Sequence, residues 1–285
     1  MKLIKFLFIF TIIYALIIIK PLTAQTNLQD GLYIGADLNG RFSPYLDGGG
    51  KIMLFYRFIS DVFPGYIWEG IKTDVGISDH ISAEMNRLTL YVNSSISEYF
   101  NIDVKVSMLN YYLSYAKRGF VNFNSPSDDF GTNSIANAPK TSNLSFEAEA
   151  TPTFRVSFLK SLFEGRGLTL QAGVTFKYAY NKYGKYYLDY DLLLIRDQND
   201  ISYKLDSMLL FDLMPLTVGI NYMLAYMNNT KQLWHSIGAY ANLQYEFINR
   251  IYTEVNLRIG QYLGHPEFPA TLYFDMNAMI TYRII

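Results

Sequence analysis

The chain has 285 residues, and 24 Lys and Arg against 25 Asp and Glu give it a net charge of −1 at pH 7. This balance offers no basic surface for nucleic acid, so we predict no nucleic-acid partner. There is no Cys, which excludes disulfide bonds and lipoprotein acylation. The chain is rich in aromatic residues, with 25 Tyr and 20 Phe, yet its mean hydropathy is only +0.07.

The first 24 residues have the layout of a secretory signal peptide. Two Lys residues precede a largely apolar run at positions 6–19, and small Ala24 follows a Lys-Pro break. As a helix, this run would span about 21 Å, short of a roughly 30 Å hydrocarbon core. We therefore predict a signal peptide over residues 1–24 rather than a membrane anchor. Because the removed segment holds three Lys and no acidic residue, the mature chain at 25–285 would carry a charge of −4.

The mature sequence alternates between apolar and polar residues over long stretches. The pattern is clearest at residues 144–158, 168–181 and 272–283, where every second side chain is apolar. Successive side chains of a strand point to opposite faces, so each stretch predicts a strand with one apolar wall and one polar wall. In lipid, a sheet with these walls must close on itself, because an open edge would leave unpaired amides in hydrocarbon.

Counting all such stretches predicts about twelve strands, with 10–14 possible. The other nine expected strands lie at residues 32–38, 51–58, 66–77, 88–93, 102–108, 201–211, 216–225, 237–245 and 251–258. The fold class is therefore all-β: a transmembrane antiparallel up-and-down β-barrel that forms one domain. The two longest connections, at 117–141 and 183–199, fall on the same side. Outer-membrane barrels have short periplasmic turns and longer external loops, so this side is predicted to be external.

The pattern as a whole resembles bacterial outer-membrane β-barrels as a class, and porins in particular. The last strand runs almost to the chain end, as in those barrels, although they typically end in an aromatic residue and this chain ends in Ile284-Ile285. The resemblance implies the bacterial outer membrane as location, membrane lipid as surroundings and the barrel-assembly machinery as a partner during insertion. A soluble periplasmic β-sandwich or lipocalin-like barrel is the alternative.

The wall predicted to face the lumen carries charges of both signs. These candidate lumen-lining residues are Asp37, Arg87, Asp103, Lys105, Glu147, Glu149, Arg155, Lys177, Glu254, Arg258, Asp275 and Arg283. In a water-filled pore they would filter solutes by charge, and in a plugged barrel they would neutralise one another. We predict a narrow porin-like channel for passive diffusion of small hydrophilic solutes. The alternative is a structural or surface-interaction barrel that acts through the loops at 117–141 and 183–199, and the first of these is expected to be mobile rather than a constriction of the lumen.

The sequence predicts no catalytic residue, no cofactor and no metal site, so the chain is expected not to be an enzyme. A remote alternative is an outer-membrane lipid hydrolase that uses His80 and Ser82, placed at the outer rim. The tripeptide His80-Ile81-Ser82 resembles part of the motif of outer-membrane phospholipases and lipid A deacylases. Ala83-Glu84 follows it here in place of Asn-Gly, so the oxyanion-side residues are missing. His265 is expected to be solvated in a short loop.

Overall fold

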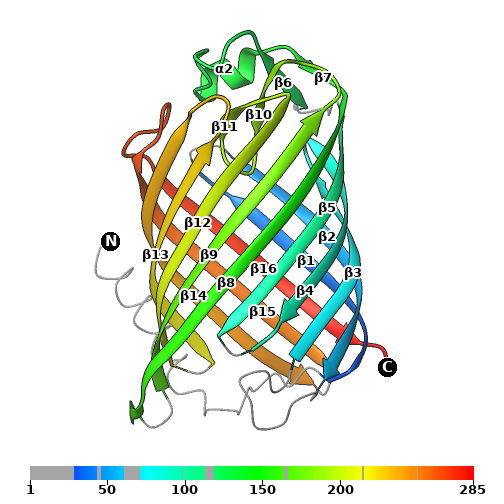
Figure 1. Cartoon of the computed structure of the whole chain (residues 1–285), viewed down its shortest axis with the longest axis vertical. Coiled ribbons are helices and arrows are strands. Elements are labelled where there is room, and N and C mark those ends of the chain that lie inside the picture. Colours follow the sequence, from blue (N-terminus) through cyan, green and yellow to red (C-terminus); the bar gives the residue numbers. More distant parts are fainter. Residues whose placement is uncertain are drawn as a thin grey trace, which may run out of the picture.

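The computed structural model describes residues 29–285, except 44–45, 61–70, 98, 113–118, 164–165, 214 and 249. The predicted signal peptide therefore lies outside the described residues. Twelve antiparallel strands form a closed barrel, which confirms both the fold class and the strand count. Figure 1 shows the strongly tilted strands and a small second layer of structure that covers one end of the cylinder.

The wall follows the chain in order, from β1 to β16. Its strands are β1 (Gly31–Arg41), β2 (Asp47–Ser60), β3 (Ile71–Ser82), β4 (Met85–Ser95), β5 (Phe100–Tyr111), β8 (Asn143–Phe163), β9 (Arg166–Asn181), β12 (Asn199–Asp212), β13 (Leu216–Met227), β14 (Leu233–Ile248), β15 (Ile251–Gly264) and β16 (Leu272–Arg283). Each pairs with the next, and β1 pairs with β16 to close the cylinder. No open sheet edge is left in this wall, as a strand structure in lipid requires.

The outer wall is apolar along its length. Large hydrophobic side chains on alternate positions are exposed, including Ile52 (64%), Leu90 (62%) and Phe154 (62%). Their neighbours on the opposite face point into the barrel, so the alternation read from the sequence separates a lipid wall from a lumen wall. An apolar surface of this extent would be unstable in water, and hydrocarbon is the surrounding that it fits.

Leu90 lies at the middle of β4 and supplies a test of the lipid wall. We expect Leu90→Arg to destabilise the folded barrel by about 2–4 kcal/mol, because a charge at the bilayer midplane is costly. Urea titration of protein refolded into lipid vesicles measures this difference, with Leu90→Ala as the control that keeps the surface apolar. Equal effects of the two substitutions would mean that Leu90 does not face lipid.

Strand β3 differs from its predicted limits. We expected a strand at 66–77 and an external connection at 78–84, whereas β3 extends to Ser82 and only residues 83–84 form the turn to β4. Residues 66–70 lie outside the described part. The alternation is weak here because Asp79, which pairs with outward-facing Ile52 and Leu88, is polar, so that five of the six residues at 78–83, all but Ile81, are polar or small.

The two longest connections fold together over one end of the barrel. Between β5 and β8 lie β6 (Phe120–Phe123), α2 (Thr132–Asn137) and β7 (Lys140–Thr141), and between β9 and β12 lie β10 (Tyr186–Asp189) and β11 (Leu194–Asp197). The four strands form one sheet in the order β11-β10-β6-β7. We call the described residues 119–141 and 182–198 the cap (Figure 1).

The cap corrects the prediction of a mobile loop at 117–141. Phe120, Phe130 and Ile135 are at most 1% exposed and belong to one apolar core with barrel side chains such as Leu109 and Trp234. Few apolar residues in this loop suggested mobility, but Phe120, Val121, Phe130 and Ile135 are all buried against partners from distant strands. No helix in the described ranges is long and apolar enough to cross a membrane.

Candidate functional site: the lumen and the cap contacts

A cavity of about 1180 Å³ runs along the inside of the barrel. At the capped end its lining includes Arg41 and Asp47, the last residue of β1 and the first of β2. At the other end it includes Asp212, the last residue of β12, and Pro215 in the following turn. We call these two ends of the cavity the capped rim and the turn rim. The cavity therefore extends from one end of the wall to the other.

In the β1–β3 sector of the wall the cap makes polar contacts, in which Arg41 of β1 donates to the carbonyls of Tyr190 at 3.3 Å and Asp191 at 3.4 Å. The apolar core of the cap contains residues of β4, β5 and β13–β16 and none of the described residues of β1–β3. In that sector the imidazole of His80 lies over Gly49, where a Cβ atom would be 2.4 Å from Nε2, and reaches Asn39 at 3.3 Å. The missing side chain at Gly49 thus makes room for the imidazole of His80, which lines the cavity.

The predicted lumen residues fall into three groups. Those that line the cavity are Arg87, Asp103, Lys105, Glu147, Glu149, Arg155, Glu254, Arg258 and Asp275. Asp37 and Lys177 also face inward but are 5% and 4% exposed and lie in ion pairs. Arg283 lies at the chain end, where its guanidinium contacts Gln29, the Asp30 carbonyl and the Ile285 carbonyl.

Most of the lining charges are paired locally. The pairs within the lumen are Arg41–Asp275 (3.1 Å), Lys51–Asp37 (2.8 Å), Arg57–Asp74, Lys105 with Asp103 and Glu149, and Arg258–Asp206 (2.9 Å). Arg41, Lys51, Arg57, Asp74 and Asp206 were not among the predicted lumen residues. Arg41 lies three residues beyond the predicted strand at 32–38, and the other four lie in the predicted strands 51–58, 66–77 and 201–211, where the alternation is poorer. Local pairing keeps the lumen wet and close to neutral along its length.

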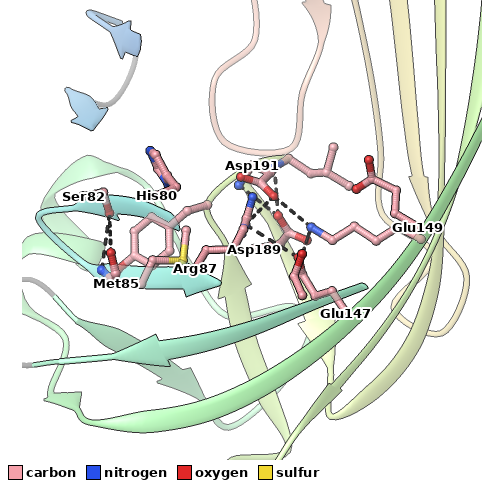
Figure 2. Close-up of polar contacts among 12 residues, drawn as sticks. His80, Ser82, Met85, Arg87, Glu147, Glu149, Asp189 and Asp191 are labelled. Carbon is pink, nitrogen blue, oxygen red and sulfur yellow. Dashed lines mark hydrogen bonds and ion pairs between the residues drawn. The ribbon is translucent and has the colours of Figure 1, made fainter. Parts of the chain in front are cut away.

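A buried ionic cluster joins the cap to the wall (Figure 2). The carboxylate of Asp191, a cap residue, accepts a hydrogen bond from Arg87 at 2.7 Å and one from Lys177 at 2.9 Å. Lys177 also contacts Glu147 at 2.9 Å and Asp189 at 3.5 Å. Asp189 also accepts a hydrogen bond from Arg196 at 2.6 Å, a cap residue that is fully buried.

The charges of this cluster explain how the cap is held. The wall residues Arg87, Glu147 and Lys177 sum to +1, and the cap residues Asp189, Asp191 and Arg196 sum to −1. Burial alone would raise the pKa of Asp191, but the facing charges of Arg87 and Lys177 hold it well below its ordinary value. The carboxylate therefore stays ionised, and cap and wall attract each other in a site with little water.

The cap residues of the cluster were missed at the sequence level. A signal was present, because Leu192-Leu193-Leu194-Ile195 is an apolar run inside a connection that should otherwise be solvated. These four side chains are at most 5% exposed. Asp189, Asp191 and Arg196 flank this buried run, and buried charges usually have ionic partners. Which partners they meet depends on the tertiary arrangement alone.

His80 and Ser82 do not form a catalytic pair in this structure. Both face the lumen rather than the outer rim, since His80 lines the cavity and Ser82 is buried. The hydroxyl of Ser82 donates to Glu84 at 2.9 Å and accepts the amide of Met85, whereas His80 contacts Asn39 (Figure 2). Ser82 thus stabilises the turn at 83–84. In the described ranges no group of three or more His, Asp or Glu side chains is arranged to hold a metal ion.

A polar cluster on β14 and β15 lines the opposite part of the cavity. The amides of Asn242 and Asn256 each donate to Glu254 Oε1 at 2.9 Å, and Asn242 also donates to Asn256 Oδ1 at 2.7 Å. The Tyr240 hydroxyl donates to the same Asn256 oxygen at 2.6 Å. Glu254 thus offers its second oxygen, Oε2, to the cavity.

Searches with the sequence find no matching family model and no matching curated protein. Solved structures with a similar fold include the β-domain of the Bordetella autotransporter BrkA, at 8% identity over 90% of this chain and 99% of that chain, with a TM-score of 0.50. The COG4313 outer membrane channel from Pseudomonas putida F1 has 10% identity over 90% and 97% and a TM-score of 0.44. The NanC porin has 10% identity over 88% and 100% and a TM-score of 0.38.

At identities this low, such similarity concerns the fold and not the activity. It agrees with the closed twelve-stranded wall and with the apolar outer surface. The chain is a closed twelve-stranded antiparallel β-barrel with an apolar outer wall, the fold that it shares with the BrkA β-domain.

Proposed function

We propose that this barrel is a narrow channel for passive diffusion of small hydrophilic solutes. The observation that carries the proposal is the cavity that reaches from Arg41 and Asp47 at the capped rim to Asp212 and Pro215 at the turn rim. A barrel that served only as a scaffold would be filled by its own side chains, as small barrels often are. Among the described residues, the apolar clusters inside the barrel are the cap core and the small cluster of Tyr33, Met53 and Phe55, and the cavity remains beside them.

The lining charges predict weak selectivity among ions. Seven Lys and Arg and nine Asp and Glu line the cavity, which leaves a net charge of −2. Since most of these charges are locally paired, the field along the lumen is weak, and a small preference for cations follows. The alternative of a surface-interaction barrel has less support, because both long loops bury their apolar residues in the barrel rather than presenting them outside.

Planar-bilayer recordings of the refolded protein test this proposal. We expect small discrete conductance steps, and a lower conductance for Asn39→Trp, because a large ring at Asn39 narrows the sector beside the cap. Leu38→Trp is the matched control, since Leu38 is the next residue but is 65% exposed on the lipid side. Silence of correctly folded protein, or equal conductance of the two variants, would contradict a path through this sector.

A further inference from the structure

Four charged residues that line the cavity have no ionic partner among the described residues. They are Asp47, Arg155, Asp212 and Glu254; every other lining Asp, Glu, Lys or Arg is in an ion pair. Asp47 and Asp212 lie at the two rims, where they accept hydrogen bonds from Gly48 and Thr217. Arg155 and Glu254 lie inside the lumen, and they have opposite signs.

The strand register shows where these two residues lie relative to each other. The ion pair Arg258–Asp206 joins residues three strands apart that lie at one level of the barrel. It therefore shows how far the strand register shifts along the barrel axis from one strand to the next. Following the register from Asp206 through β13 and β14 leads to Tyr262 on β15, yet Arg258 makes the contact, four residues closer to the turn rim. Tilted strands cause this offset, since a step to the next strand along the hydrogen bonds also moves along the barrel axis.

The same reasoning places Arg155 and Glu254 at one level. The register leads from Arg155 through β9, β12, β13 and β14 to Gly260 on β15, five strands away. The offset grows in proportion to the number of strands crossed. Four residues over three strands therefore correspond to about six or seven residues over five strands. Glu254 is six residues closer to the turn rim than Gly260. Five of twelve strands is nearly half the circumference, so the two charges face each other across the lumen.

Both groups have free hydrogen-bonding capacity. Arg155 is exposed to the cavity, and no side-chain hydrogen bond or ion pair of its guanidinium occurs among the described residues. Glu254 uses Oε1 for the amides of Asn242 and Asn256, which fix the carboxylate in place and leave Oε2 for a ligand. A guanidinium binds a carboxylate through two parallel hydrogen bonds, and a carboxylate binds an ammonium group.

We propose that Arg155 and Glu254 form a binding site for zwitterionic solutes, such as amino acids and short peptides, within the channel. Arg155 binds the carboxylate end of the solute and Glu254 binds its ammonium end. A neutral polyhydroxyl solute would leave both charges unmatched, and an ion of one sign would match one of them only. Because both groups stay hydrated in the open lumen, binding is weak, which suits a site that must also release its solute. The inference rests on the proposed function, since it takes the lumen to be accessible.

Calorimetric titration of the refolded full-length protein tests the site independently of conductance. The probe is the dipeptide alanyl-alanine, and the control ligand is N-acetyl-alanine amide, which has similar size and no charge. We expect the dipeptide to bind and the control ligand not to bind. Arg155→Gln and Glu254→Gln should each weaken dipeptide binding about tenfold or more, because each removes a charge-assisted hydrogen bond.

Matched variants separate recognition from general effects of charge. Lys185→Gln and Glu267→Gln remove one charge of each sign from exposed or loop positions outside the cavity, and they should leave binding unchanged. The double variant Arg155→Glu with Glu254→Arg exchanges the two charges. It should recover binding that each single charge reversal abolishes, because the dipeptide then binds in the opposite direction. A purely structural role for these residues would give no such recovery.

Three results would overturn the site: no binding of the dipeptide, equal binding of the uncharged ligand, or binding that neither single variant weakens. Stronger binding of acetate or of methylamine alone than of the dipeptide would also overturn it, since one charge would then be sufficient. If the protein conducts ions and does not bind the dipeptide, the channel stands and the site does not. If it binds the dipeptide and stays silent in bilayers, the site stands and the proposed passage does not.

Discussion

Replacing Lys177 by Met should release the cap and widen the channel. The ammonium group of Lys177 contacts Glu147, Asp189 and Asp191, and the side chain is 5% exposed. Its removal leaves the buried carboxylates of Glu147 and Asp189 and the partly exposed one of Asp191 with only Arg87 and Arg196 to neutralise them. Breaking a buried ionic cluster at one member costs about 3–5 kcal/mol, because a buried charge loses its partner. This cost falls on the docked cap rather than on the wall, whose strands remain paired.

The measurements are single-channel conductance and limited proteolysis from the external side. We expect a larger conductance for Lys177→Met and faster cleavage within residues 119–141. Lys105→Met is the control, because Lys105 also pairs with two carboxylates but is 38% exposed to the cavity, where a pair contributes about 1 kcal/mol or less. The double variant Lys177→Met with Glu147→Gln restores neutrality and should restore part of the cap contact. A closed, protease-resistant cap in Lys177→Met would show that the apolar core alone holds it.

The wall of this barrel could be predicted from the sequence, and the cap could not. Each wall residue faces either lipid or lumen, and successive residues alternate between the two. Apolar and polar side chains therefore alternate along the sequence of each strand. The prediction weakened at the end of β3, where Asp79 puts a polar side chain on the outward face between lumen-facing Ser78 and His80. Strand limits were therefore wrong there, while the strand count was right.

The cap is held by contacts between parts of the chain that are distant in sequence. Arg87 meets Asp191 across 104 positions, and Trp234 donates to the Leu192 carbonyl across 42. The alternation of residues along one strand contains no information about contacts between such distant positions. In the same way, Arg155 and Glu254 could be predicted to face the lumen individually, but their opposition depends on the shear of the closed barrel. Whether either residue has an ionic partner also depends on the folded barrel and could not be predicted from the sequence.

Acidification from pH 7 towards pH 4 should loosen the cap through His265. The sequence suggested a solvated residue, but His265 is 5% exposed and is surrounded by the rings of Phe130 from the cap, Tyr262 and Phe268. Its Nδ1 accepts the amides of Glu267 and Phe268, both at 3.2 Å, so the ring is neutral with its proton on Nε2. Burial lowers the pKa of His265 to about 4; the Leu193 backbone opposes this shift and the charge of Arg41 adds to it.

The direction of the pH effect follows from this lowered pKa. The released imidazole has an ordinary pKa near 6.5, so the closed form binds fewer protons than the open form at intermediate pH. The stabilisation by neutral His265 is complete above about pH 6.5 and is lost as the pH falls through about 4. Facing cations hold the pKa of Asp189 and of Asp191 below the ordinary value despite burial, so these two cap carboxylates keep their charges as the pH falls. Burial and the facing carboxylate of Asp129 in the cap raise the pKa of Glu267, so this residue also takes up a proton as the pH falls. The share of His265 is the part of the response that His265→Gln removes.

Conductance recorded at steps from pH 7 to pH 4.5 tests this dependence. The wild-type channel should open further as the pH falls, because a proton on Nδ1 places a charge among aromatic rings and removes the acceptor of two amide hydrogen bonds. His265→Gln cannot titrate and should give a conductance that is nearly constant over the same range. Lowering the pH also protonates lumen carboxylates, so the informative quantity is the difference between the two proteins. If their pH profiles coincide, lumen carboxylates rather than His265 control the response to acid.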